Sequence, residues 1–140
     1  IERYNDRTPM QCDESKNAGF STGQPWVAVN PNYEEINVQE ALAKPDSIFY
    51  TYQKLIQIRK ENSWLIRADF ELLDTAEKVF AYIRKDGDRR FLVVANLSNE
   101  EQDMTVEGTV KSVLIENTVA QEAFEKQILV PWDAFCVELL

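Results

Sequence analysis

The chain has 140 residues, with 15 lysines and arginines against 24 aspartates and glutamates, so its formal net charge is −9 and its isoelectric point is near 4.5. Because nucleic-acid-binding proteins need a basic surface, this acidity argues against nucleic acid as a partner. The chain contains no histidine, which excludes Ser-His and Cys-His catalytic pairs and imidazole metal sites. The length allows one domain or parts of two.

Cysteine usage and hydropathy narrow the class further. Cys12 and Cys136 lie at opposite ends of the chain and form no CxxC pair, so we expect reduced thiols, no metal site and no cofactor. No apolar run approaches the ~20 residues of a membrane span, and Ile1–Tyr4 lack the features of a signal peptide. We therefore expect a cytoplasmic protein with no membrane partner.

The first 36 residues read as one long loop. They contain Pro9, Gly19, Gly23, Pro25 and Pro31 among many Asn, Ser and Thr residues, which makes a long regular element improbable. Loops of this length are uncommon in compact domains and are usually functional or part of a larger structure. The sequence thus reads as a segment cut from a longer chain.

Two helices are predicted next. Asn37 with Glu40 three residues on matches an N-terminal capping pattern, and Pro45 ends this first short helix. Asp46 is the predicted N-cap of a second helix that runs to about Glu61, in which apolar residues recur every three or four positions. This apolar stripe is wider than a small β domain can cover, so we expect either self-association through it or partial disorder of the helix.

After residue 62 the apolar period changes from 3.6 to 2, which is typical of strands. The predicted strands are Asp69–Leu73, Lys78–Arg84, Phe91–Leu97, Met104–Val106, Ser112–Glu116, Gln127–Val130 and Phe135–Leu139. Asp86-Gly87 between two apolar runs predicts a tight hairpin turn. A weak helical pattern covers Val119–Glu125. Strands spaced in this way indicate an antiparallel sandwich or open barrel, so the chain reads as α followed by β.

Few residues carry a chemical signal of their own. Without histidine, the composition supports only a carboxylate pair with arginine or lysine helpers, and the acid clusters at 34–35 and 100–103 read as solvated surface. Four basic residues flank the hairpin turn and are interpreted as charges that keep a sheet edge soluble: Arg84, Lys85, Arg89 and Arg90. Arg3 and Arg7 have two interpretations: two guanidiniums four residues apart in a loop can bind carboxylates or vicinal hydroxyls in a bidentate manner, or they are two solvated surface charges, as most charged loop residues are.

A long string of residues resembles a known family. Residues 7–11 read RTPMQ, residues 17–20 read NAGF, Pro25-Trp26 follows, and residues 29–33 read VNPNY. This string resembles the oligo-1,6-glucosidase and α-glucosidase branch of the α-amylase superfamily, the family 13 glycoside hydrolases. The resemblance continues into the predicted helix after Asp46 and covers essentially the whole chain. Cys12 stands where the family has Trp, and Tyr4 stands where it has Asp.

The resemblance implies an α+β segment of a retaining glycoside hydrolase. Residues 1–67 would be the last loop and helix of a (β/α)₈ barrel, and residues 68–140 an antiparallel β-sandwich C-terminal domain. The parent would be an exo-acting α-glucosidase that acts on short α-gluco-oligosaccharides through two carboxylates. Neither carboxylate matches this chain, so we expect no catalytic residue in it and no activity from it alone. Arg3 and Arg7 align with substrate-pocket arginines of the family.

Two other classes of function stay open. In the first, a free-standing β-sandwich binds carbohydrate through a tryptophan, because aromatic faces stack on sugar rings. The candidates are Trp26, Trp64 and Trp132. We expect Trp64 to pack between the long helix and the sheet, and Trp132 to pack in the core or between domains. In the second, the chain is a structural module that braces a partner domain.

Overall fold

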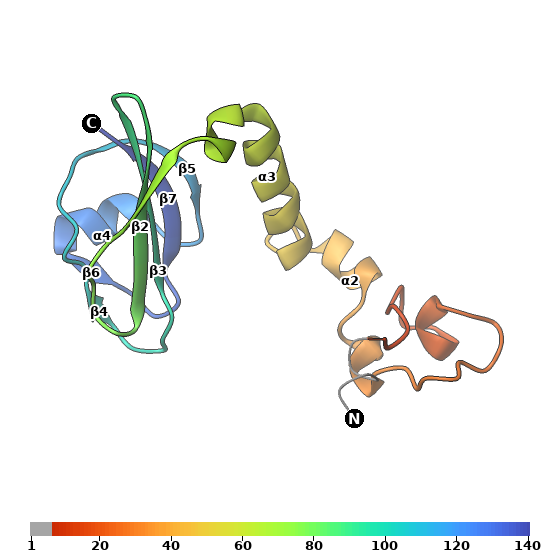
Figure 1. The fold of residues 1–140 in the computed structure, drawn as a ribbon. Helices are drawn as coiled ribbons and strands as arrows, with labels where there is room; N and C mark the ends of the chain where they lie inside the picture. Colours follow the sequence, from red (N-terminus) through yellow and green to blue (C-terminus); the bar gives the residue numbers. More distant parts are fainter. Residues whose placement is uncertain (1–6) are drawn as a thin grey trace. The chain divides into compact units, whose positions relative to one another are not determined.

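The computed structural model describes residues 7–140, and within it the chain divides into two compact units, residues 1–56 and 57–140. Both units are shown in Figure 1, and each is described by itself. No helix of the described part combines the length and apolarity needed to cross a bilayer. The domain boundary predicted after residue 67 stays a prediction.

The first unit is mostly irregular, as its Pro and Gly content predicts. It contains two short 3₁₀ turns, η1 (Lys16–Gly19) and η2 (Pro31–Glu34), followed by the helix α2 (Val38–Ala43). The predicted cap of α2 is confirmed, since the side chain of Asn37 accepts a hydrogen bond of 2.8 Å from the amide of Glu40.

The long helix α3 (Ile48–Glu61) begins in the first unit and continues into the second. The predicted N-cap at Asp46 is wrong by one residue: Ser47 precedes the helix, and its carbonyl accepts the first helical bond from Thr51. No side chain of α3 is buried. The predicted apolar stripe lies between 41% and 76% exposed and consists of Ile48, Phe49, Tyr52, Leu55 and Ile56.

The second unit is built on a five-stranded antiparallel sheet with the order β1-β2-β3-β7-β5. The strands are β1 (Asp69–Leu72), β2 (Val79–Asp86), β3 (Arg89–Asn96), β5 (Val110–Glu116) and β7 (Ala134–Leu139). The predicted hairpin is confirmed, because β2 and β3 pair through a two-residue turn in which Gly87 has a φ of +59°.

One face of this sheet carries the core of the unit. Helix α4 (Ala120–Lys126) and a small second sheet of β4 (Gln102–Asp103) and β6 (Ile128–Leu129) supply the rest of the core (Figure 1). The fully buried residues of this core come from every layer and include Leu92, Val94, Leu129 and Val137.

The strand predicted at Met104–Val106 is wrong, since β4 is Gln102–Asp103. Met104 is buried in the core, so the alternating pattern does report burial. The partner strand β6, however, begins only at Ile128, because Gln127 is the left-handed C-cap of α4. The Met104 amide donates to the Gln127 carbonyl, and beyond this bond β4 finds no further residue of β6 with which to pair.

The basic residues at the hairpin do more than keep an edge soluble, which corrects the prediction for two of them. Arg84 donates to the carbonyls of Leu65 and Ala68 at 2.8 Å each, so it fastens the segment that precedes β1 to the sheet. Arg89 forms a two-point contact with the carboxylate of Glu138, at 3.0 and 3.2 Å. These guanidiniums are structural ties between segments far apart in sequence.

Glu138 lies at the centre of a charged cluster. Its carboxylate is buried and accepts hydrogen bonds from Arg89 and, at 2.9 Å, from Lys111. The hydrogen bonds from these two cations hold the pKa of Glu138 at about 2.

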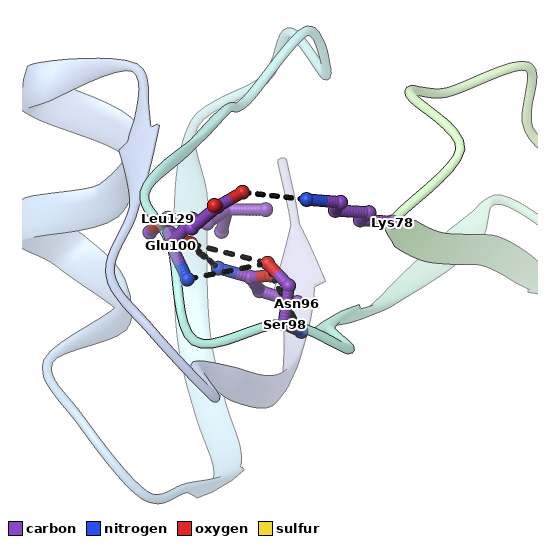
Figure 2. A network of polar contacts seen from close by, with 5 residues as sticks. All are labelled: Lys78, Asn96, Ser98, Glu100 and Leu129. Carbon is purple, nitrogen blue, oxygen red and sulfur yellow. Dashed lines mark hydrogen bonds and ion pairs between the residues drawn. The ribbon is translucent and has the colours of Figure 1, made fainter.

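A polar network fixes the loop that follows β3 (Figure 2). The amide of Asn96, which is buried, donates to the carbonyls of Glu100 at 2.8 Å and Leu129 at 3.3 Å, and its oxygen accepts from the amide and hydroxyl of Ser98. The exposed carboxylate of Glu100 pairs with Lys78 at 2.5 Å. One side chain thus ties the loop to the small sheet.

Candidate functional site

Of the two arginines predicted to bind substrate, Arg3 lies outside the described residues. Arg7 is exposed, and no ion pair joins it to an acidic residue among residues 8–140. The assignment of both to a substrate pocket therefore stays a prediction. What the structure does show is how the segment that carries Arg7 is held.

The segment after Arg7 is anchored by the side chain and backbone of Gln11. Its side-chain amide donates to the Asn32 side chain at 3.0 Å and to the carbonyl of Ile36. Its own carbonyl accepts from the amide of Val38 at the start of α2. These contacts bind the loop to the turn that precedes α2, so the position of the arginine segment is coupled to residues more than twenty positions away.

Three consecutive residues in the left-handed region lock the next part of the loop. Asn17, Ala18 and Gly19 have φ values of 57°, 57° and 64°, although only glycine adopts this region without strain. Ala18 is fully buried, and its carbonyl accepts a hydrogen bond of 2.8 Å from the backbone amide of Cys12. The side-chain amide of Asn17 donates to two more backbone carbonyls, at 2.9 and 3.0 Å. Sequence reasoning noted this NAGF string only as a family motif.

Asp13 explains why the third of these positions is glycine. A Cβ added at Gly19 would meet the carboxylate of Asp13 at 2.5 Å. The hydroxyl and amide of Ser15 both donate to that carboxylate, and these bonds lower the pKa of Asp13. Sequence reasoning missed Asp13, although Asp-x-Ser ahead of a glycine is a signal for such a turn.

A shallow depression of about 600 Å³ lies over this loop. Its lining combines the carboxylate of Asp13, the ammonium group of Lys16, the aromatic ring of Phe20 and several hydroxyls. Such groups can bind the hydroxyls and the apolar face of a sugar. Arg7 is not among the residues that line it. Among the residues from 7 onward, no group of three or more acidic or thiol side chains is arranged to hold a metal ion.

The three tryptophans have different environments. Trp64 follows α3 and stacks on Phe91 of the sheet, with 3.8 Å between ring centroids, so its predicted packing on the sheet is confirmed. Trp26, in the first unit, is 85% exposed. Trp132 is 59% exposed, so the prediction that it packs in the core is wrong, whereas the alternative that it packs between domains stays a prediction.

Both parts of the chain match known families. Residues 1–68 match the family model described as "Alpha amylase, catalytic domain", and residues 79–132 match "Alpha-amylase SusG C-terminal domain". The chain is thus built from two pieces that occur together in α-amylase-type glycoside hydrolases.

Individual relatives narrow this class. The chain is 87% identical over all 140 residues to the glucan 1,6-alpha-glucosidase of Streptococcus pneumoniae serotype 4 (strain ATCC BAA-334 / TIGR4), and covers 26% of it. It is 50% identical over 100 residues to the oligo-1,6-glucosidase of Bacillus cereus, with 71% of this chain and 18% of that protein covered. The crystal structure of trehalulose synthase MutB from Pseudomonas mesoacidophila MX-45 superposes with a TM-score of 0.88 at 36% identity over 99% of this chain and 26% of that chain.

The chain belongs to the α-amylase superfamily, in its oligo-1,6-glucosidase branch. It spans 26% of the Streptococcus pneumoniae relative and of the MutB chain, and 18% of the Bacillus cereus relative.

Proposed function

We propose that this chain is the C-terminal part of an exo-acting, retaining α-glucosidase that hydrolyses α-1,6-glucosidic bonds of short gluco-oligosaccharides. The observation that carries the proposal is the 87% identity, over every residue of the chain, to a protein named glucan 1,6-alpha-glucosidase. Relatives named trehalose-6-phosphate hydrolase are 36% and 46% identical, which favours the α-1,6-glucan specificity over theirs.

In this proposal the two parts of the chain have different tasks. Residues 1–67 form the last loop and helix of a (β/α)₈ barrel, whose active site lies at the C-terminal ends of the strands. Residues 68–140 form the β-sandwich domain that follows. Retaining hydrolysis needs a nucleophilic carboxylate and a carboxylic acid about 5–5.5 Å apart. Both come from the preceding part of the barrel, so the chain of 140 residues alone is inactive.

A chimaera tests the proposal directly. The segment of the Streptococcus pneumoniae relative that matches this chain is replaced by residues 1–140, and hydrolysis of isomaltotriose and maltotriose is compared. We expect kcat/KM for isomaltotriose within about threefold of the unmodified relative, with the same preference over maltotriose. The isolated chain, assayed in parallel, releases no glucose. A folded chimaera without activity on isomaltotriose, or an active isolated chain, contradicts the proposal.

The chimaera also tests the two arginines. If Arg3 pairs with a pocket carboxylate and binds glucose hydroxyls, Arg3→Ala leaves that carboxylate unpaired, at a cost of about 2–5 kcal/mol. This corresponds to a fall of roughly 30-fold to several thousand-fold in kcat/KM. Arg3→Lys restores little, because an ammonium group lacks the planar fork, and Arg7→Ala also lowers turnover.

Arg90 is the matched control for these substitutions. It is an exposed arginine of the second unit, so Arg90→Ala leaves kcat/KM within about twofold. Equal losses in Arg3→Ala and Arg90→Ala, at matched thermal stability, would show that the loop is only a connector.

The exposed stripe of α3 supports a proposal about the isolated chain. Five large apolar side chains on one helix rarely stay bare on a soluble monomer, so we propose that the 140-residue chain self-associates through this stripe. Sedimentation equilibrium measures the oligomer, and Leu55→Glu with Ile56→Lys should shift it to monomer. A wild-type chain that is monomeric at high concentration contradicts the self-association.

A further inference from the structure

Trp132 combines an exposed side chain with a strained backbone. Its φ of 60° lies in the left-handed region, which is a clear outlier for a bulky residue. Its side chain is 59% exposed, so core packing does not compensate for the strain. Strain of this kind persists only where the surroundings over-determine it, and it clusters at ligand-binding sites.

Polar contacts from two other segments hold the turn in this conformation. The side-chain amide of Asn117 donates to the carbonyl of Trp132 at 2.8 Å, and its oxygen accepts from the amide of Ala134 at 2.8 Å. The amide of Trp132 donates to the carbonyl of Ser98 at 3.0 Å. The loop that contains Ser98 is itself fixed by the network of Figure 2. The exposed indole is therefore mounted on a rigid support.

The same turn forms one wall of a pocket. Val130 and Asp133, on either side of Trp132 in the chain, line a pocket of about 340 Å³ together with Thr118, Val119 and α4. This volume lies at the lower end of the range for small-molecule sites, about 300–1,000 Å³. The side chain of Asp133 is 2% exposed and accepts a hydrogen bond from the Thr118 hydroxyl. This bond fixes the wall of the pocket at Asp133.

The lining selects the chemistry of the ligand. Val119 and Val130 supply half-exposed apolar surface, whereas Glu101 and Glu122 supply exposed carboxylates. The one lysine that lines the pocket, Lys126, is paired with Glu122 at 2.5 Å. This excess of acids disfavours phosphorylated or acidic ligands, while carboxylates accept hydrogen bonds from hydroxyls. Trp132 itself is not a lining residue, but it lies in the chain between two that are, Val130 and Asp133, and its exposed indole can stack on the apolar face of a neutral sugar.

From these observations we infer that the pocket and Trp132 form a second carbohydrate-binding site in the β domain, which takes a neutral gluco-oligosaccharide. The site contains no acid–base pair assigned to hydrolysis and does not depend on the activity proposed above. Its role is to hold glucan.

Binding to the 140-residue chain tests the inference without any catalysis. Native gel electrophoresis with and without embedded dextran measures retention, and titration with isomaltotriose is followed through the indole N–H resonances. We expect retention by dextran, a shift of the Trp132 indole signal, and much weaker retention by carboxymethyl-dextran. No retention by dextran, with an unchanged Trp132 signal, overturns the inference, and the function proposed for the parent enzyme would be unaffected by that result.

Trp132→Gly separates a binding role from a structural one. Glycine adopts a φ of 60° freely, so the variant should fold with a melting temperature within about 5 °C of the wild type and lose at least tenfold in affinity for isomaltotriose. Trp26→Ala, which removes an even more exposed indole from the other unit, is the matched control and should bind as the wild type does. A Trp132→Gly variant that is strongly destabilised, or that binds normally, overturns the inference.

A second variant tests the pocket itself. Val119 is 53% exposed, so Val119→Arg is tolerated by the fold and lays a long side chain over the pocket. We expect at least a tenfold loss of affinity with an unchanged circular dichroism spectrum. Normal binding by this variant would show that the pocket takes no part.

Discussion

Replacing Asn96 with alanine should be among the most destabilising single changes in the β domain. The Asn96 side chain is 2% exposed, and its two N–H groups are shared among three carbonyls, those of Glu100, Leu129 and Val130, at 2.8–3.3 Å. It also accepts two from the amide and hydroxyl of Ser98, at 3.1 and 2.8 Å. Asn96→Ala removes all of these contacts at once and leaves the partner groups without Asn96.

The magnitude follows from how many of those partners can find water. The carbonyl of Leu129 is reached by a fully buried bond, whereas the bonds to Glu100 and Val130 are only partly buried. A buried group left unsatisfied costs about 1–3 kcal/mol, and a bond replaced by water about 0.5–1.5 kcal/mol. Allowing for non-additivity, we expect a loss of about 2–4 kcal/mol, or on the order of 10–25 °C in melting temperature.

Urea denaturation at pH 7 measures this loss, with Asn99→Ala as the matched control. Asn99 lies in the same loop, is exposed, and should change the free energy of unfolding by less than about 0.5 kcal/mol. Asn96→Asp keeps the acceptor but places a carboxylate against the three carbonyls, so it should cost at least as much as alanine. Equal stability of Asn96→Ala and Asn99→Ala would refute the view that this network holds the loop.

Three further outcomes test other features. Because Glu138 has a pKa of about 2 in the folded chain, below its unfolded value of about 4.3, the stability that it contributes is fully present above pH 5 and is lost as the pH falls toward 2. Glu138→Gln should flatten this decline in the free energy of unfolding, measured by urea denaturation between pH 5 and 2. An unchanged slope would count against this role of Glu138. Gly19→Ala should expose its loop to proteolysis far more than Gly87→Ala exposes the hairpin. The Cβ added at position 19 meets a carboxylate at 2.5 Å, whereas the Cβ added at position 87 meets nothing within 4 Å. Equal protection of both variants from proteolysis would contradict this. Arg84→Ala should lower the free energy of unfolding by about 1–3 kcal/mol and the exposed Arg90→Ala by less than about 0.5 kcal/mol, whereas matching losses would show that the contacts of Arg84 to the backbone contribute little.

Local sequence signals predicted the strands of the second unit but not the side-chain contacts that connect its distant segments. The period-2 alternation and the Asp86-Gly87 turn were enough for the β2–β3 hairpin, because register and turn are set within about twenty residues. The contacts of Arg84 to Leu65 and Ala68 and of Arg89 to Glu138 connect residues 16 to 49 positions apart. No local pattern reports such partners, so charged residues beside a turn were interpreted as solvated.

The candidate site was found by resemblance and not by physics. A pair of arginines in a loop is not specific, and the structure shows Arg7 exposed with Gln11 as the residue that fixes the segment. An amide that bridges a turn twenty residues away has no signature in the sequence. The left-handed run at Asn17–Gly19 was visible only as an Asn and a Gly, since the alanine between them gives no hint of a positive φ.

The four non-glycine residues with positive φ in the described part differ in how their strain is explained. Asn17 and Ala18 belong to a loop closed by backbone and side-chain hydrogen bonds, and Ala18 is fully buried. Gln127 ends α4 in the left-handed conformation that commonly terminates helices. Trp132 alone combines a bulky exposed side chain with no helix to end, and smaller residues would satisfy the same backbone contacts. Contacts within the described residues therefore give no reason for an indole at this position, and the pocket lined by Val130 and Asp133 supplies one.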